Sequence, residues 1–102
     1  YNIKHGSEIV YYTNGKMRSS VVYDNGKLNG PAVYYYANGK VSVSKYYVYN
    51  LLHGVEKRYY GNGNISKELN WANGKLNGNF IFYNYQGKQV AIHVYSNGRR
   101  VK

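Results

Sequence analysis

The sequence predicts an all-β protein in which hairpins follow one another as an antiparallel meander of about eight strands. Three observations lead to this prediction. Glycines recur every 24 residues, at positions 6, 30, 54 and 78. Asn-Gly pairs, which favour tight hairpin turns, start at positions 14, 25, 38, 62, 73 and 97. No stretch of the sequence shows the apolar period and capping residues of a helix.

Other residues keep the same 24-residue period. The turns are marked by Gly15, Gly39, Gly63 and Gly87, and by Gly26, Asn50, Gly74 and Gly98. Asn is the residue that best replaces Gly at positive φ, so we expect a left-handed backbone at the Asn50 position in every unit. We therefore predict one repeat domain over residues 1–102, with a partial unit at 1–5 and repeats at 6–29, 30–53, 54–77 and 78–102.

Each repeat is expected to form two strands. In the first repeat these are residues 7–13 and 16–23, joined by a turn at Asn14-Gly15 and followed by a connection over 24–30. A type I′ turn suits each Asn-Gly pair. A two-residue turn would place Tyr12 opposite Met17 and Tyr11 opposite Arg18. The more apolar face would carry Val10, Tyr12, Met17, Val21 and Tyr23, with Val41 and Ile65 at equivalent places in later repeats.

The fourth repeat is expected to differ from the other three. Val90, Ile92 and Val94 alternate one residue out of step with the earlier repeats. Because a one-residue slip exchanges the faces of a strand, we predict a bulge or longer turn at 85–87. Such a change is typical of a terminal cap that buries a different side.

The composition favours strands and a basic surface. The chain has 15 Tyr, 12 Gly and no Cys, and its 14 Lys and Arg outnumber four acids, which gives a net charge of +10. This charge favours acidic partners, although it also serves to keep a Tyr-rich β surface soluble and to protect sheet edges. The lack of Cys excludes disulfides and thiolate metal sites but leaves the redox compartment open. No apolar run approaches the ~18 residues of a membrane span.

The repeated motif is G-x4-Y-Y-x-N-G-K followed by Y-x-N-G-K-x-x-G. The first repeat carries it as Gly6, Tyr11-Tyr12, Asn14-Gly15-Lys16, Tyr23, Asn25-Gly26-Lys27 and Gly30. This motif resembles the MORN repeat of the bacterial second type, whose members are often labelled antitoxin-like. The second and third repeats fit nearly as well, and the fourth departs most, with Asn84, Gln86 and Gln89.

The resemblance covers essentially the whole chain. It implies an elongated, twisted, largely single-layer sheet built from hairpins. It also implies a binding or scaffolding role, with protein partners, self-association or anionic lipid headgroups as the ligands attributed to the family. Because secreted and surface-associated bacterial members are common, the resemblance favours a secreted or cell-surface location over a cytoplasmic one.

Catalysis, a cofactor and a metal site are not expected. The carboxylates Glu8, Asp24, Glu56 and Glu68 are scattered over three repeats, and a glycosidase needs two that flank one bond. Glu8 and Glu56 share a repeat position and are expected to be surface or cross-strand charges. His5 and His53 also share one position, two repeats apart, and are expected to lie in loops. Gly61-Asn62-Gly63 is expected to be a turn, since no helix or GK[ST] follows.

Binding residues are expected on an aromatic row and on basic rims. The row is formed by Tyr11, Tyr35, Tyr59 and Tyr83. The candidate basic residues are Lys16, Arg18, Lys40, Lys57, Arg58, Arg99 and Arg100. Exposed aromatic rows beside Lys and Arg suit protein interfaces, nucleobases or sugars. The alternatives are that the tyrosines only cover the sheet and that the lysines only solvate turns.

The sequence therefore predicts a non-enzymatic binding or scaffold module that acts by protein–protein contact or self-association through its aromatic face. The alternative function is electrostatic binding of anionic lipid, acidic polysaccharide or another polyanion. Nucleic acid ranks low because the chain carries no recognised nucleic-acid fold signature. Salt separates the two functions, because polyanion binding weakens steeply with salt and an apolar interface barely responds.

Overall fold

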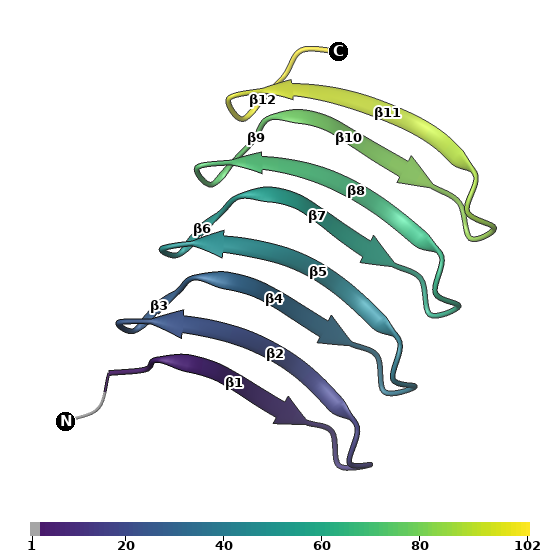
Figure 1. The fold of residues 1–102 in the computed structure, drawn as a ribbon. Helices are drawn as coiled ribbons and strands as arrows, with labels where there is room; N and C mark the ends of the chain where they lie inside the picture. Colours follow the sequence, from purple (N-terminus) through teal and green to yellow (C-terminus); the bar gives the residue numbers. More distant parts are fainter. Residues whose placement is uncertain (1–2) are drawn as a thin grey trace.

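A computed structural model describes residues 3–102 as one open antiparallel sheet without helices (Figure 1). The long strands are β1 (Gly6–Tyr11), β2 (Met17–Asp24), β4 (Gly30–Tyr35), β5 (Val41–Val48), β7 (Gly54–Tyr59), β8 (Ile65–Ala72), β10 (Gly78–Tyr83) and β11 (Gln89–Ser96). The short strands are β3 (Lys27–Leu28), β6 (Leu51–Leu52), β9 (Lys75–Leu76) and β12 (Arg99–Arg100). Long strands pair in chain order, which confirms the predicted meander. Residues 3–102 contain no helix that could cross a membrane.

The molecule is long and thin, with extents of 48 × 33 × 12 Å. Two sheets packed face to face would need ~10 Å between them in addition to the side chains outside, so the thickness corresponds to one layer. The strands lie across the long axis and are stacked from β1 to β12 with a progressive twist (Figure 1). The elongated, twisted, single-layer architecture is therefore confirmed. Tyr1 and Asn2 of the predicted partial unit lie outside the described residues.

The hairpin register differs from the prediction by one residue near the first turn. Val10 pairs with Ser19 as expected, but Tyr11 pairs with Met17 and leaves Arg18 as an extra residue in a bulge. Equivalent bulges occur in the other three hairpins, at Tyr34/Tyr35, Arg58/Tyr59 and Phe82/Tyr83. Paired residues share a face, so Met17, Val41 and Ile65 lie with the Tyr11 series rather than with Val10.

The predicted turn type is wrong at one edge of the sheet. The loop there is one residue longer than predicted, which shifts the register next to the turn, and the bulge restores it. Gly15 N donates to Tyr12 O at 3.0 Å and Tyr12 N donates to Lys16 O at 2.8 Å. These bonds enclose a three-residue loop in which only Gly15, at φ 86°, has positive φ. This is a type I turn followed by a left-handed residue. At the opposite edge, Asn25 and Gly26 have φ of 50° and 79°, as a type I′ turn requires.

The repeat position of Asn50 has a left-handed backbone throughout. Asn50 has φ of 70°, while Gly26, Gly74 and Gly98 have φ of 79°, 81° and 88°. The glycines of the three-residue loops, Gly15, Gly39, Gly63 and Gly87, have φ of 86°, 92°, 96° and 90°. The backbone of each unit therefore repeats closely even where the side chains change.

We predicted that the fourth hairpin would differ from the other three, and this prediction is wrong. Asn84 N donates to Lys88 O and Gly87 N donates to Asn84 O, which is the same loop as in the first repeat. Its bulge lies at the same place as theirs, so the out-of-step residues do not change the backbone. Val90 and Ile92 are instead 61% and 45% exposed, so this side is not buried by a cap. The glycine and turn residues determine the backbone conformation, and the fourth repeat retains these residues.

The two faces of the sheet differ in burial and chemistry. We call one the tryptophan face, which carries Val21, Tyr23, Ala32, Lys45, Tyr47, Glu56, Leu69, Trp71, Phe80 and Tyr95. We call the other the tyrosine face, which carries Ile9, Tyr11, Met17, Val33, Tyr35, Val41, Tyr59, Ile65, Ile81 and Tyr83. The buried residues Val21, Ala32, Glu56 and Leu69 all lie on the tryptophan face, which therefore holds the core.

Side-chain hydrogen bonds join each repeat to the next at the edge with the three-residue loops. The hydroxyls of Tyr12, Tyr36 and Tyr60 donate to the carbonyls of Tyr35, Tyr59 and Tyr83. Beside them, the amides of Asn14, Asn38 and Asn62 donate to Ala37, Gly61 and Tyr85. Because every such bond links neighbouring units, the motif Tyr-x-Asn-Gly holds the array together as well as forming the turn.

Candidate functional site

The predicted tyrosine row lies along the tyrosine face, with one tyrosine at the end of each of the strands β1, β4, β7 and β10. Tyr11 is 61% exposed, and Tyr35, Tyr59 and Tyr83 are half-buried. Tyr11 lies beside Met17, its cross-strand partner, and Ile9 follows on the same face. Their exposures of 37% and 44% leave an open apolar surface around the first tyrosine. The row is therefore accessible, although the register places it among apolar residues more than among lysines.

The lysines after the Asn-Gly pairs lie on two opposite rims of the sheet (Figure 1). At one rim, the ammonium groups of Lys16 and Lys40 donate to the carbonyls of Asn38 and Asn62 in the next repeat, at 3.3 and 3.2 Å. Asn64 replaces lysine in the third repeat and donates to Tyr85 O at 3.0 Å. Lys16 and Lys40 thus have a structural role between repeats in addition to their exposed charge.

The remaining candidate cations are dispersed. Lys57 and Arg58 are consecutive in β7, so Lys57 lies on the tyrosine face and Arg58 on the tryptophan face. The Arg18 guanidinium lies 5.8 Å from the centroid of the Tyr12 ring. Arg99 and Arg100 form β12 at the far rim, where Arg100 donates to Lys102 O at 3.2 Å. The structure does not bring these candidates together into one site.

The sequence predicted a surface or cross-strand charge at Glu56, and the surface alternative is wrong because the side chain is buried. Its side chain is 1% exposed, the least of any large side chain in the described chain. Arg58 Nε donates to one carboxylate oxygen at 2.7 Å, and Trp71 Nε1 donates to the other at 2.9 Å. A buried carboxylate requires such partners because its desolvation is costly. The sequence signal was present, since Glu56 and Arg58 replace the apolar Ala32 and the aromatic Tyr34 of the second repeat.

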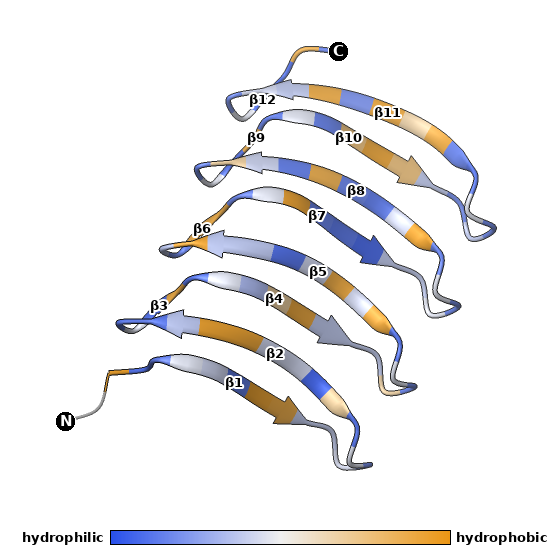
Figure 2. Cartoon of the chain, in the orientation of Figure 1, coloured by the Kyte–Doolittle hydropathy of each residue, from blue (hydrophilic) through white to orange (hydrophobic). Residues whose placement is uncertain are grey.

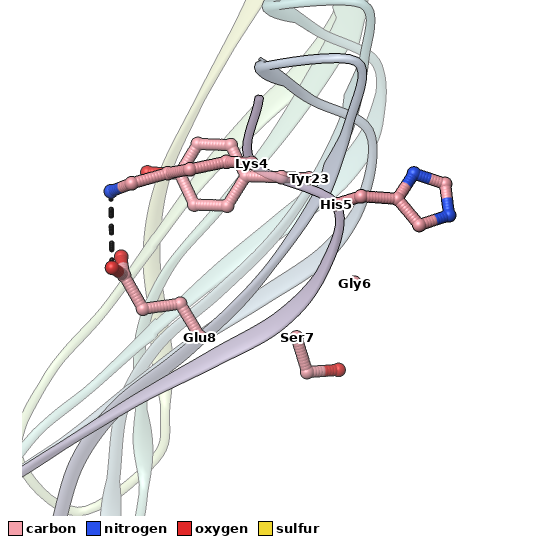
Figure 3. Close-up of a pocket in the computed structure, with 6 residues that line it drawn as sticks. All are labelled: Lys4, His5, Gly6, Ser7, Glu8 and Tyr23. Carbon is pink, nitrogen blue, oxygen red and sulfur yellow. Dashed lines mark hydrogen bonds and ion pairs between the residues drawn. The ribbon is translucent and has the colours of Figure 1, made fainter. Parts of the chain in front are cut away.

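An open hollow of about 220 Å³ lies at the outer edge of β1 (Figure 3). Lys4 Nζ lies 3.0 Å from Glu8 Oε2 and 4.8 Å from the centroid of the Tyr23 ring. The hydrogen bond to Glu8 and the attraction of its charge raise the pKa of Lys4 above its ordinary value of 10.5. His5 points away from this pair, and its Nδ1 lies 3.4 Å from Asp24 Oδ1.

Residues 3–102 hold no group of three His, Cys, Asp or Glu that could bind a metal ion. In the hollow, Glu8 is engaged by Lys4, and the two face solvent together (Figure 3). What the structure presents instead is two broad faces with different side chains, an arrangement suited to binding a macromolecule.

Comparison with known families agrees with this arrangement. The sequence matches the MORN repeat variant at residues 4–25, 28–49 and 52–73, three tandem copies that together span more than half of the chain. The chain belongs to the MORN repeat variant family. No curated protein matches the sequence. The matched MORN repeats contain the long strands β1, β2, β4, β5, β7 and β8, and residues 78–102, the predicted fourth repeat, lie beyond them.

MORN repeats are generally non-enzymatic binding repeats that mediate contacts with proteins or membrane lipids. Membership therefore indicates a repeat-based binding module. In the present MORN repeats the structural positions are the turn glycines, the hydroxyl-bonded Tyr12, Tyr36 and Tyr60, and the turn asparagines. The residues that vary between repeats lie on the two faces, which is where a partner could be recognised.

Proposed function

We propose that this chain is a protein-binding module whose tyrosine face docks a protein partner. The observation that carries the proposal is the exposure of large apolar residues on that face. Tyr11, Ile9, Tyr46, Val55 and Ile92 are each between 44% and 61% exposed. Among the described residues that pair on the tryptophan face, Val10 is the one large hydrophobic side chain that is more than 40% exposed. Extended apolar surface on one side of a soluble protein is typical of an interaction site.

The tyrosine face is large enough for a stable interface. The sheet measures 48 × 33 Å across its face, well above the ~800 Å² that each partner buries in an ordinary complex. Its centre is close to neutral, because Lys57 lies directly opposite Glu68 on the neighbouring strand. A neutral apolar surface with exposed tyrosines suits a protein partner better than a polyanion.

A different protein is favoured over a second copy of this chain. The net charge of +10 means that two copies stacked face to face would repel each other. A partner that is neutral or acidic would not meet this cost. Self-association through the same face remains an outcome that the oligomeric state can reveal.

The test compares two substitutions on opposite faces of β1. Ile9→Ser with Tyr11→Ser removes exposed apolar groups from the tyrosine face. Val10→Ser is the matched control, since Val10 lies between them, is 41% exposed and points to the other face. The wild type and both variants would be used in pull-downs at low and high salt, followed by mass spectrometry of retained proteins.

We expect the wild type and Val10→Ser to retain the same protein at both salt concentrations and the double variant to lose it. Loss of every partner at high salt would overturn the proposal in favour of a polyanion. Equal loss from Val10→Ser would show that the tyrosine face has no special role. Size-exclusion chromatography of the purified chain would reveal self-association as the cause of retention.

A further inference from the structure

The repeat pattern breaks on the tryptophan face at one place, in the middle of the sheet. Lys45 occupies a position where the other repeats have Val21, Leu69 and His93. Arg58 stands where they have Val10, Tyr34 and Phe82, and Lys67 stands where they have Ser19, Val43 and Ala91. Figure 2 shows the resulting hydrophilic bands on β5, β7 and β8, next to more apolar strands on both sides. Three cations therefore replace mainly apolar or neutral residues within one part of the array.

The register brings these three substitutions together. Arg58 on β7 pairs directly with Lys67 on β8. On the other side of β7, Arg58 pairs with Val43 of β5, and Lys45 follows two residues later on the same face. Adjacent strands are ~4.8 Å apart and Lys45 is offset by two residues, ~7 Å, along β5, so the backbone positions of Lys45, Arg58 and Lys67 lie within about 12 Å of one another. We call Lys45, Arg58 and Lys67 the cationic cluster.

Glu56 holds the central member of the cationic cluster in place. The carboxylate is buried beneath Arg58 and accepts a hydrogen bond from its Nε, while Trp71 Nε1 binds the second oxygen. The Arg58 side chain makes no other hydrogen bond within residues 3–102 and is 48% exposed. Its terminal nitrogens are therefore free to donate outward, in the planar pair that matches a carboxylate.

The cationic cluster has more positive charge than its own acids neutralise. Glu56 is the single carboxylate paired with it, and Lys45 and Lys67 form no ion pair in the described part of the chain. The Lys45 ammonium lies 5.3 and 5.5 Å from the ring centroids of Tyr34 and Tyr47. Phe82 pairs with Lys67 on the following strand, so aromatic rings border the cluster on both sides.

We propose that the cationic cluster on the tryptophan face is a docking site for an acidic segment of a partner protein, with Arg58 binding a carboxylate through its terminal nitrogens. Charge complementarity selects an acidic occupant. The open sheet surface selects a macromolecule, because a small ligand needs a concave site. Arg and Trp, which bind the same Glu56 carboxylate here, are enriched among the residues that dominate the binding energy of protein interfaces. The site lies on the face opposite to the apolar one and stands independently of it.

The test uses a fluorescein-labelled decapeptide of alternating Glu and Leu, titrated into the full chain and followed by fluorescence anisotropy. We expect Arg58→Gln to weaken binding by about tenfold, as for loss of a charge-assisted hydrogen bond. Lys57→Gln makes the same charge change on the adjacent residue of the opposite face, and we expect at most a twofold effect. Arg58→Lys, which keeps the charge without the planar pair, should weaken binding by an intermediate factor.

Glu56→Gln distinguishes positioning from simple attraction. This substitution makes the protein more positive, so an effect of net charge alone would strengthen binding of the acidic peptide. If Glu56 positions Arg58, binding should instead weaken severalfold. Circular dichroism of each variant would verify that the sheet is retained, and any variant that loses it would be replaced by Lys67→Gln.

Three results would overturn the proposal. The first is failure of the wild type to bind the peptide better than a decapeptide of alternating Gln and Leu. The second is an equal loss of affinity in Lys57→Gln and Arg58→Gln. The third is Arg58-dependent binding to phosphatidylserine vesicles or heparin without binding to the peptide, which would assign the cationic cluster to a membrane or a polysaccharide.

Discussion

Val55 and Glu56 are consecutive residues of β7, yet the valine is 46% exposed and the glutamate is 1% exposed. Alternation along the strand places Val55 on the tyrosine face and Glu56 on the tryptophan face. The same contrast extends over the sheet, since the four buried side chains lie on the tryptophan face and most exposed large apolar residues lie on the other. In a single layer, burial depends on what neighbouring side chains cover, and hydrophobicity alone does not decide it.

The contrast has a physical cause in side-chain size. On the tryptophan face, Tyr23, Tyr47, Trp71 and Tyr95 alternate with glycines across the strands, and large rings cover the backbone between them. Lys45 pairs with Ala32, which is fully buried, so the lysine stem covers the smaller residue. On the tyrosine face no aromatic residue of the described strands pairs with a glycine in this way, and its apolar groups remain accessible.

The largest expected effect compares Leu69 with Ile92. Leu69→Ala on the tryptophan face removes a side chain that is 5% exposed, and we expect a loss of about 3 kcal/mol in the free energy of unfolding. Ile92→Ala on the tyrosine face removes one that is 45% exposed, and we expect less than about 1 kcal/mol. Urea unfolding followed by circular dichroism measures both. Equal losses would mean that the two faces are buried alike in solution.

A smaller difference is expected between two glutamates. Glu56→Gln weakens the bonds from Arg58 and Trp71 to a buried carboxylate and should cost about 1–2 kcal/mol in the free energy of unfolding. Glu68→Gln on the tyrosine face changes a carboxylate without such bonds and should stay within about 0.5 kcal/mol of wild type. The measurement is the same unfolding experiment at pH 7. A stabilised Glu56→Gln variant would contradict the structural role given to this carboxylate.

Adjacent tyrosines provide a third comparison. The Tyr36 hydroxyl donates to Tyr59 O in the next repeat, so Tyr36→Phe should lower the free energy of unfolding by about 1 kcal/mol. Tyr35 belongs to the tyrosine face, and Tyr35→Phe should leave the stability unchanged. Thermal unfolding of the two variants beside wild type tests this. The outcome that would remove the distinction is an equal shift in melting temperature.

The smallest expected effect concerns Glu8, which occupies the same repeat position as Glu56 but is exposed and paired with Lys4. Since Glu8 raises the pKa of Lys4, Glu8→Gln should return that pKa toward 10.5, as followed by NMR titration of the Lys4 side chain. The sign follows from linkage. The pair's contribution to stability is fully present below pH 10.5 and is lost as the pH rises through the higher folded pKa.

The same linkage predicts a pH range in which the stability difference between the two proteins does not change. The stability difference between wild type and Glu8→Gln should be constant from about pH 7 to 9, because Lys4 is protonated in both the folded and unfolded states there. A difference that changed over this interval would point to another titrating group. Burial alone would then not account for the difference between Glu8 and Glu56.

The sequence predicted the hairpin meander because its period is carried by residues with strict backbone roles. Asn50 shows this best, since it replaces Gly at a position whose φ is positive in every repeat. The turn types could not be predicted in full. Tyr12 to Lys16 and Tyr23 to Lys27 share the pattern Tyr-x-Asn-Gly-Lys but form a three-residue loop and a two-residue turn, respectively.

The two turns differ in their contacts with neighbouring repeats. Gly26 N donates to Lys4 O of the preceding unit, whereas the Asn14 side chain donates to Ala37 O of the following one. Such contacts lie 22 or 23 residues apart and are invisible to a local motif. The resulting one-residue change of register moved Met17 to the tyrosine face. Glu56 was also misassigned, because its burial depends on Trp71 and Arg58 together.

Strands that lie across the long axis also determine how this protein responds to force. Antiparallel hydrogen bonds run perpendicular to the strands, so a pull between β1 and β11 acts along those bonds. The bonds at the loaded edge then break one after another, and the terminal hairpin peels away before its neighbours. A pull across the 33 Å width loads all the bonds of a strand in shear at once. The protein is therefore mechanically soft along its length and stiff across it.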